Sequence, residues 1–362
     1  MNTLIESTDA ARALIGKVLH QGADIAADYP LVFGEGSPGR VITLEEDGEL
    51  RAACTVLVRE FVVDGVRIKG GMIGSVVADP DHQGRGLGTK LLLQAEIALQ
   101  LEGCAFALLW ASQPDWYLKR GYAPMGSEND FLITPGARGG LPKATDVRVF
   151  TPADAGAVHA IYEAHGARVA RTADETTTLL GCPGMRTVVR EREGRVVAYA
   201  CYGRGADLQN SIHEWGGDVE DVLALVRALL DHHCDVADPD QPVFLIAPPQ
   251  AVDLSYRLLT LGVASQRGML GLGKVLDRRT AAAALAERLP EGGNAEVITT
   301  PLGEQVYLSG PKDEGELADD AVLALLFAAT EIRQDVAQFL ERFGLENAQL
   351  PLEPFVWGLD SI

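Results

Sequence analysis

The feature that most constrains this chain is a glycine-rich turn between an apolar strand and an amphipathic helix. The strand spans residues 72–78, and apolar residues recur at helical spacing over 87–99. Between them lie the alternate glycines Gly84, Gly86 and Gly88. Such a turn exposes consecutive backbone N–H groups, and the start of a helix adds partial positive charge. The turn is therefore suited to a pyrophosphate, although glycines at a helix entry also serve packing.

Length and charge limit the classes of protein that fit. The 362 residues exceed what one hydrophobic core usually organises, which favours two or three domains. With 51 acidic and 31 basic residues the net charge is −20, which repels nucleic-acid phosphates and anionic lipids and attracts cations. No run approaches the roughly 20 apolar residues that a membrane span needs. We therefore expect no nucleic acid and no membrane as partners, and a cationic substrate.

The cysteines and histidines predict neither a disulfide framework nor a metal site. The cysteines are odd in number and form no CxxC pair: Cys54, Cys104, Cys182, Cys201 and Cys234. His232 and His233 are adjacent on a predicted helix, so their side chains point in different directions and favour a structural role. The N-terminus lacks a basic segment followed by an apolar one. These observations together predict a protein of the reducing cytoplasm without a metal.

Periodicity predicts a mixed α/β (α+β) fold in which one order of elements occurs twice. After an opening helix, residues 49–79 read as antiparallel strands broken at 63–65 and at Gly70-Gly71, followed by the turn and helix above, a strand at 106–110 and a short helix at 115–122. Beyond a glycine- and proline-rich linker at 135–142, the second half predicts a helix at 154–165, a hairpin at 186–202, a strand at 211–215 and a helix at 219–232. A third segment predicts a helix at 280–289, strands within 296–308 and helix over 316–343. We therefore predict domains at 1–145, 146–277 and 278–362.

The turn also resembles a known signature. Gln83-Gly84-Arg85-Gly86-Leu87-Gly88 resembles the acetyl-CoA motif Gln/Arg-x-x-Gly-x-Gly/Ala of the GCN5-related N-acetyltransferase superfamily, in the expected place between strand and helix. The resemblance implies acetyl-CoA as cosubstrate, with the backbone of the strand pairing with pantetheine and the turn surrounding the pyrophosphate. The implied cofactor-binding residues are Val76, Val77, Gln83, Arg85, Gly86, Gly88 and Thr89.

A second pattern of the superfamily, Tyr-x-x-x-Gly-Tyr/Phe, is matched by residues 117–122. By that resemblance Tyr117 is the general acid, since a phenol beside the thioester sulfur can donate a proton to the departing thiolate. The alternative is a packed core aromatic, which is the role we expect for Tyr122.

The whole arrangement resembles the enhanced intracellular survival family, which has two tandem acetyltransferase folds and a C-terminal sterol-carrier-like domain. Here the third segment, 278–362, is short for that domain. The second fold departs from the cofactor signature, because its helix begins with Asp218, Glu220 and Asp221, which would repel a pyrophosphate. We therefore expect acetyl-CoA only in the first fold. The resemblance also implies a homo-oligomer and polyamine acceptors of the aminoglycoside kind.

The proton acceptor is less obvious from sequence. The strand 72–78 holds no carboxylate, which leaves Glu60 on a preceding strand, a water relay, or the terminal carboxylate of Ile362. The last nine residues, 354–362, are mostly apolar and aromatic and so look docked, and the resemblance implies that the chain end reaches the first active site. We predict direct acetyl transfer to a primary amine. The alternatives are a non-catalytic acyl-CoA-binding sensor or assembly protein, and transfer to a protein amine.

Overall fold

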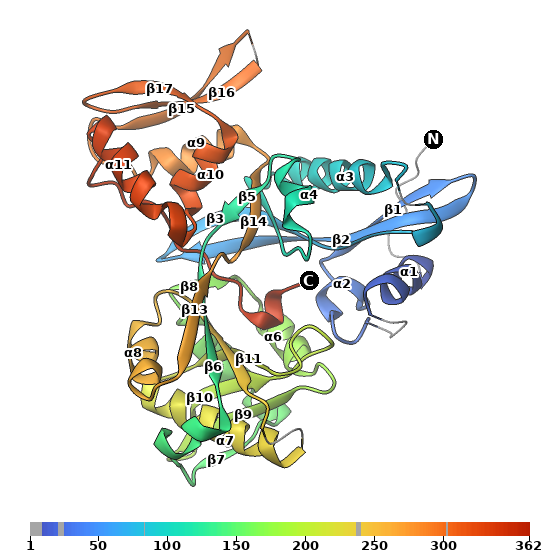
Figure 1. Ribbon diagram of the computed structural model, residues 1–362, viewed down its shortest axis with the longest axis vertical. Coiled ribbons are helices and arrows are strands. Elements are labelled where there is room, and N and C mark those ends of the chain that lie inside the picture. The colour runs from blue at the N-terminus through green and yellow to red at the C-terminus, as the bar shows by residue number, and fades with distance from the viewer. Residues whose placement is uncertain (1–8, 21–24, 83, 237–239, 302) are drawn as a thin grey trace.

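Three sheets and their helices make up the computed structural model of the chain, which describes residues 9–20, 25–82, 84–236, 240–301 and 303–362 (Figure 1). The mixed α/β class predicted from periodicity is confirmed. No helix among these residues has the length and apolar character required to cross a bilayer.

The first sheet has the order β1-β2-β3-β4-β14-β5, with β8 pairing on β2. Its strands are β1 (Arg40–Glu46), β2 (Glu49–Val63), β3 (Val66–Ala78), β4 (Phe106–Leu109), β5 (Ala123–Met125), β8 (Ala167–Val169) and β14 (Gly271–Val275). Its helices are α1 (Asp9–Leu19), α2 (Pro30–Phe33), α3 (Leu87–Leu101) and α4 (Pro114–Leu118), with 3-10 turns at Pro80–His82 and Pro135–Gly140. The predicted helix after the glycine turn is thus confirmed as α3.

The predicted break at Gly70-Gly71 is wrong, because β3 runs through both glycines. A Cβ at Gly70 would lie 2.5 Å from the Phe106 ring, and one at Gly71 would lie 2.5 Å from Leu99. These glycines make room for core side chains rather than turning the backbone. The turn at 63–65 is confirmed, with Asp64 and Gly65 both at positive φ.

The second sheet has the order β13-β6-β12-β11-β10-β9-β7. Its strands are β6 (Glu128–Ile133), β7 (Val147–Val149), β9 (Arg186–Arg192), β10 (Arg195–Tyr202), β11 (Ser211–Gly216), β12 (Val243–Ala247) and β13 (Ala264–Gly268). Its helices are α5 (Ala155–Glu163), α6 (Ala173–Leu180), α7 (Val219–Val236) and α8 (Val252–Thr260), with a 3-10 turn at Pro152–Asp154. The predicted hairpin of the second half is confirmed as β9 and β10, and the predicted strand and helix after it are confirmed as β11 and α7. The helices α6 and α8 were not predicted.

The two large sheets exchange strands. β6 precedes the glycine- and proline-rich segment yet lies between β13 and β12 of the second sheet, and β14 of the second half lies between β4 and β5 of the first. Both crossings are visible in Figure 1 as β6 in the lower unit and β14 in the upper one. The limit at 145 therefore does not separate the two large sheets, because each of them is completed by a strand from across it, whereas the third sheet lies wholly beyond 277.

The third unit is a small sheet, β15-β16-β17, covered by helices. Its elements are β15 (Asn294–Thr300), β16 (Gly303–Ser309), β17 (Glu314–Leu317), α9 (Arg278–Ala286), α10 (Asp319–Phe327) and α11 (Arg333–Phe343), with a 3-10 turn at Thr330–Ile332. Continuous helix over 316–343 is wrong, because β17 completes the sheet and an irregular segment separates α10 from α11. That the third unit is a sterol-carrier-like domain stays a prediction.

The C-terminal segment leaves the third unit and runs between the two large sheets (Figure 1). Phe355, Trp357 and Leu359 are fully buried there, and the Trp357 indole donates to the carbonyl of Ala167 at 3.1 Å. Burial of these apolar side chains holds the tail in place. The docked tail predicted from its composition is confirmed.

Candidate active site

A bulge in β3 opens the site. The pairing of β2 with β3 shifts register between Ala53 and Thr55, and Ser75 adopts a φ of 51°. The last paired residues of parallel β3 and β4 are Met72 and Leu108, so the two strands separate beyond this point. The gap between them is a cavity of about 640 Å³.

The glycine turn forms one end of this cavity. Gly84 and Gly86 have φ of 78° and 76°, a region that side chains disfavour, so glycine is required there. Gly86 occupies the N-cap position of α3 and has no side chain with which to cap the helix. The first turn of α3 lines the cavity, and its backbone N–H groups have no side-chain cap there. This is the geometry of an anion site at a helix N-terminus.

Most of the predicted cofactor-binding residues line this cavity, namely Val76, Val77, Gly86, Gly88 and Thr89. Gln83 lies outside the described residues. Arg85 is not among the lining residues: its side chain is 61% exposed and lies 3.9 Å from Glu46.

Arg120 is a lining residue that the sequence analysis did not single out. Its guanidinium donates to Thr89 Oγ1 at 2.8 Å and stacks 3.6 Å from the centre of the Trp116 ring. It therefore places a positive charge beside the start of α3. It belongs to the 117–122 motif and lies two residues beyond the end of α4, and its place four residues after Trp116 was the available signal.

Tyr117 lines the same cavity from α4. Its ring packs edge-on against those of Trp116, at 4.7 Å, and Tyr122, at 5.7 Å. Burial, followed by the nearby Cys54 thiol, raises the pKa of Tyr117 to about 12. The phenol is therefore protonated at neutral pH, as a proton donor must be.

A second cavity, of about 470 Å³, adjoins the first. The two share Leu19, Ser75 and the segment 110–112. Its far wall comes from distant parts of the chain: Tyr29, Glu128, Asp207, Leu270 and Ile362. The exchanged strand β6 supplies Glu128 to this wall, and the docked tail supplies Ile362.

Ile362 reaches the bulged strand through a glycine. A Cβ on Gly74 would lie 2.5 Å from the carbonyl oxygen of Ile362 and 2.8 Å from Thr55 Oγ1. Only a residue without a side chain lets the chain end approach β3 this closely. The carbonyl end of Ile362 therefore lies against Gly74, in the lining of the second cavity.

Glu60, the alternative proton acceptor, lies elsewhere. It pairs with Lys69 in the β2–β3 ladder, five residues from the Thr55–Gly74 pair, or about 16 Å along the strand. Its carboxylate bonds Arg67 at 2.6 Å, and it lines neither of the two adjoining cavities.

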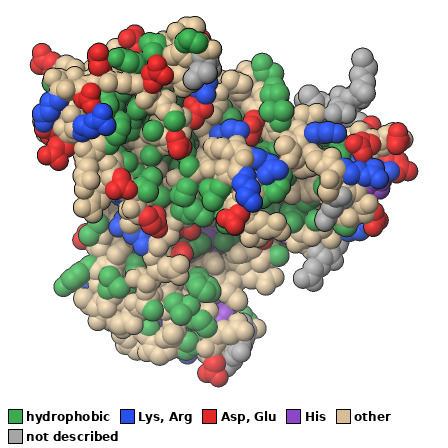
Figure 2. Space-filling view, turned by 45° about the horizontal axis from the view of Figure 1, so that its top comes forward, with side chains coloured by type: hydrophobic (Ala, Val, Ile, Leu, Met, Phe, Trp, Pro, Cys, Tyr) green, Lys and Arg blue, Asp and Glu red, His purple; other side chains and the backbone are tan. Residues whose placement is uncertain are grey.

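The second cavity is acidic. Burial, followed by the negative charge of Asp130, raises the pKa of Glu128 to about 8. The Tyr29 hydroxyl donates to the carboxylate of Asp207. No Lys or Arg is among the described residues of its lining. Because burial keeps Glu128 protonated at neutral pH, the negative charge of this wall comes from the carboxylate of Asp207 and from the chain end, and it attracts a cationic group. Elsewhere basic and acidic side chains stand in small mixed groups on the face shown in Figure 2.

The helix after β11 in the second sheet begins differently from α3, with carboxylates in its first turn. Asp221, at the start of α7, bonds Arg190 and Arg192, and Glu220 pairs with Arg257. Across the corresponding strands, β11 and β12, the Trp215 indole donates to the carbonyl of Ile246 at 3.0 Å. In the second sheet this indole therefore spans the gap between β11 and β12. The corresponding gap in the first sheet, between β3 and β4, stays open.

A larger cavity of about 930 Å³ lies in the second unit beside α5. Its charged lining residues are the balanced set Arg148, Asp154, Arg195 and Asp218 rather than a cationic one. It reaches the start of α7 at Gly217 and Asp218, where carboxylates replace the glycines found at the start of α3, so size alone does not make it a cofactor site.

Metal and disulfide chemistry have no site among the described residues, where no group of three His, Cys, Asp or Glu could hold a metal ion. None of the five cysteines forms a disulfide.

Comparison with known proteins agrees with this geometry. Residues 21–125 match the family model described as an acetyltransferase (GNAT) domain. This part of the chain is a GNAT acetyltransferase domain. It is the domain of an acyltransferase, and it contains the glycine turn and Tyr117. No curated protein sequence matches the chain.

Solved structures share the fold over the full length. A probable N-acyltransferase of Enterococcus faecalis is 14% identical with a TM-score of 0.70, covering 99% of both chains. A GCN5-related N-acetyltransferase of Kribbella flavida is 16% identical with a TM-score of 0.64, covering 100% of both. Eis1 of Mycobacterium abscessus is 19% identical with a TM-score of 0.61, covering 98% of this chain and 99% of its own. The GNAT domain, the strand-exchanged second unit and the third unit thus form one shared architecture.

Proposed function

We propose that the protein is an N-acetyltransferase that transfers acetyl from acetyl-CoA directly to a primary amine of a cationic small molecule. The observation that carries this proposal is the pair of adjoining cavities. One has a glycine-rich helix start and Tyr117, and the other has an acidic wall and the chain end.

The residues of the first cavity fit acetyl-CoA. The glycine turn has positive φ at Gly84 and Gly86, and the start of α3 offers backbone N–H groups to an anion. Arg120 adds a positive charge beside that helix start. When bound, acetyl-CoA supplies an acetyl group activated as a thioester. We assign Val76, Val77, Gly86, Gly88 and Thr89 to its binding.

Two groups move protons in this proposal. The terminal carboxylate of Ile362 accepts a proton from the ammonium, which frees the nitrogen lone pair for attack on the thioester carbon. A C–N bond forms and the C–S bond breaks, and Tyr117 donates its proton to the sulfur. The acidic wall holds the positive charge of the remainder of the acceptor.

The compartment and the assembly also belong to this proposal. Five cysteines with no disulfide among them support a reducing cytoplasm. A homo-oligomer stays an expectation from the family resemblance.

The test is a panel of mono-, di- and polyamines, together with a lysine-containing peptide, screened for thiol release that depends on acetyl-CoA. Turnover with a cationic amine supports the proposal. Acetyl-CoA binding without turnover on any amine identifies a non-catalytic sensor instead, and turnover on the peptide alone identifies a protein acetyltransferase.

The role of the chain end is tested by appending a few residues after Ile362, which moves the carboxylate without changing any side chain. Loss of turnover with acetyl-CoA binding retained supports the terminal base. An extension that leaves the pH profile unchanged, together with inactivity of Glu60→Gln, would instead assign that role to Glu60.

A further inference from the structure

Arg204 is a buried cation that the chemistry described so far does not use. It follows β10 and is only 3% exposed. Gly203 and Gly205 flank it at φ of 72° and 48°. Glycines with left-handed φ on both sides of Arg204 turn the backbone sharply, and the Arg204 side chain is directed into the interior.

The guanidinium of Arg204 binds the last peptide units of the chain. It donates to the carbonyl oxygen of Ser361 at 2.9 Å, to Ser361 Oγ at 3.2 Å and to the carbonyl of Gly358. Ser361 directly precedes Ile362, so the peptide that carries the terminal carboxylate is fixed by this cation. A planar guanidinium sets the orientation of its acceptors as well as their distance.

The same side chain touches the wall of the acceptor cavity. Its Nε donates to the carbonyl of Asp28 at 2.9 Å, and the guanidinium lies 4.6 Å from the centre of the Tyr29 ring. Tyr29 lines the cavity that contains Ile362. Arg204 therefore ties the chain end to a segment of the first unit that borders the acceptor.

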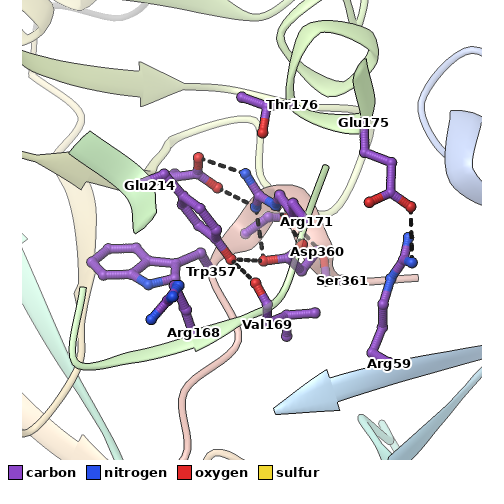
Figure 3. Close-up of polar contacts among 12 residues, drawn as sticks. Arg59, Arg168, Val169, Arg171, Glu175, Thr176, Glu214, Trp357, Asp360 and Ser361 are labelled. Atoms are coloured by element: carbon purple, nitrogen blue, oxygen red, sulfur yellow. Dashed lines mark hydrogen bonds and ion pairs between the residues drawn. The ribbon is translucent and has the colours of Figure 1, made fainter. Parts of the chain in front are cut away.

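A second anchor holds the tail further from its end. Arg171 donates to Asp360 at 2.6 Å and to Glu214 at 2.7 Å, and all three side chains are inaccessible to solvent. Figure 3 shows Arg171 between Glu214 and Asp360, and Tyr162 also donates to Asp360 at 2.8 Å. This network fixes the tail to the second unit, whereas Arg204 acts on the final peptide itself.

We propose that Arg204 is a positioning residue for the reaction, which holds the terminal carboxylate of Ile362 against Gly74 and toward the acceptor amine. The inference rests on the proposed function, in which that carboxylate is the proton acceptor. It gives the second unit a part in the reaction, because Arg204 presents the chain end to the first unit.

The experiment is a double-mutant cycle between Arg204→Gln and the C-terminal extension, measured on the full chain with the amine that the wild type acetylates best in the panel. Misplacing a reacting group by about 1 Å costs on the order of 10²-fold. We expect Arg204→Gln to lower kcat by about that factor in the normal chain, to shift the pH profile of kcat, and to keep the Kd for acetyl-CoA. In the extended chain, where the carboxylate is already displaced, it should cause little further loss.

The control is Arg168→Gln. Arg168 is a partly buried arginine of the second unit whose bonds go to Glu163 and to the carbonyl of His165, and it should leave the pH profile unchanged. If Arg204→Gln does not fold, Arg204→Lys takes its place in the cycle, because it keeps the charge and loses the planar fork.

The outcomes separate the two proposals. If Arg204→Gln lowers activity equally in the normal and the extended chain, or leaves the pH profile unmoved, the positioning role is overturned. If the extension has no effect on the wild type, the terminal base fails and the inference falls with it. If no amine is acetylated at all, the proposed function has failed first.

Discussion

At the scale of single residues, the proposed chemistry depends on a hydroxyl and several carboxyl groups around the wall that two cavities share. Tyr117 faces the first cavity, whereas Glu128, Asp207 and the Ile362 carboxylate face the second. Burial keeps both Tyr117 and Glu128 protonated to higher pH than usual. The two shifts lead to different experiments.

Tyr117→Phe should lower kcat by about 10² to 10⁴, because a positioned proton donor contributes that much to the rate. The Kd for acetyl-CoA should not change, since the ring remains. Steady-state kinetics and calorimetry separate the two quantities. Tyr122→Phe is the matched control from the same motif and should turn over like the wild type. Wild-type kcat in Tyr117→Phe would make Tyr117 a packing residue.

Glu128 predicts a pH dependence of acceptor binding. Its carboxyl ionises only as the pH rises through about 8, so a cation should bind more tightly above that pH than below it. A quaternary ammonium inhibitor reports this without titrating itself, and its inhibition constant should fall as the pH rises from 6 through about 8 to 9. Glu128→Gln should abolish the dependence. The same pH profile in that variant would show that another group is responsible.

At the scale of elements, the start of α3 distinguishes the first unit from the second. Gly86 leaves the N–H groups of α3 accessible, whereas α7 begins with carboxylates that hold arginines, and Trp215 bridges the strand gap beside it. Of these two helix starts, that of α3 therefore favours an anion, whereas the carboxylates at the start of α7 oppose one.

This contrast predicts one acetyl-CoA per chain. Gly86→Asp should abolish binding, because it adds a negative charge at the anion site and forces a side chain into a φ of 76°. Gly262→Asp, at a similar φ of 75° after α8, controls for backbone strain and should bind normally. Calorimetry checks both variants, and a stoichiometry near two would contradict the assignment.

At the scale of the whole molecule, the units depend on each other through the exchanged strands, the docked tail and a buried ion network. Although burial opposes its charge, Asp360 and Glu214 raise the pKa of Arg171 well above its usual range, so the guanidinium stays charged. Removing one member of such a buried network leaves the others uncompensated.

Arg171→Gln should therefore destabilise the protein by about 3–5 kcal/mol and release the tail. Denaturant unfolding measures the first effect, and digestion by a carboxypeptidase measures the second. Arg279→Gln, which breaks the exposed pair with Glu304, should leave the unfolding free energy close to wild type. If both variants unfold alike, the network does not anchor the tail.

The sequence by itself determined the local features of this protein. The glycine turn, α3, the Tyr117 motif, the hairpin of the second half and the apolar tail each lie within a short window, where periodicity, turn chemistry and composition act directly. Only the tertiary structure decided which strands complete which sheet, that Glu60 stands about 16 Å from the bulge, and that Tyr29, Glu128, Arg204 and Ile362 meet. Those residues lie far apart in the chain, and their meeting depends on sheet pairing and on burial of the tail, which no local pattern of residues encodes.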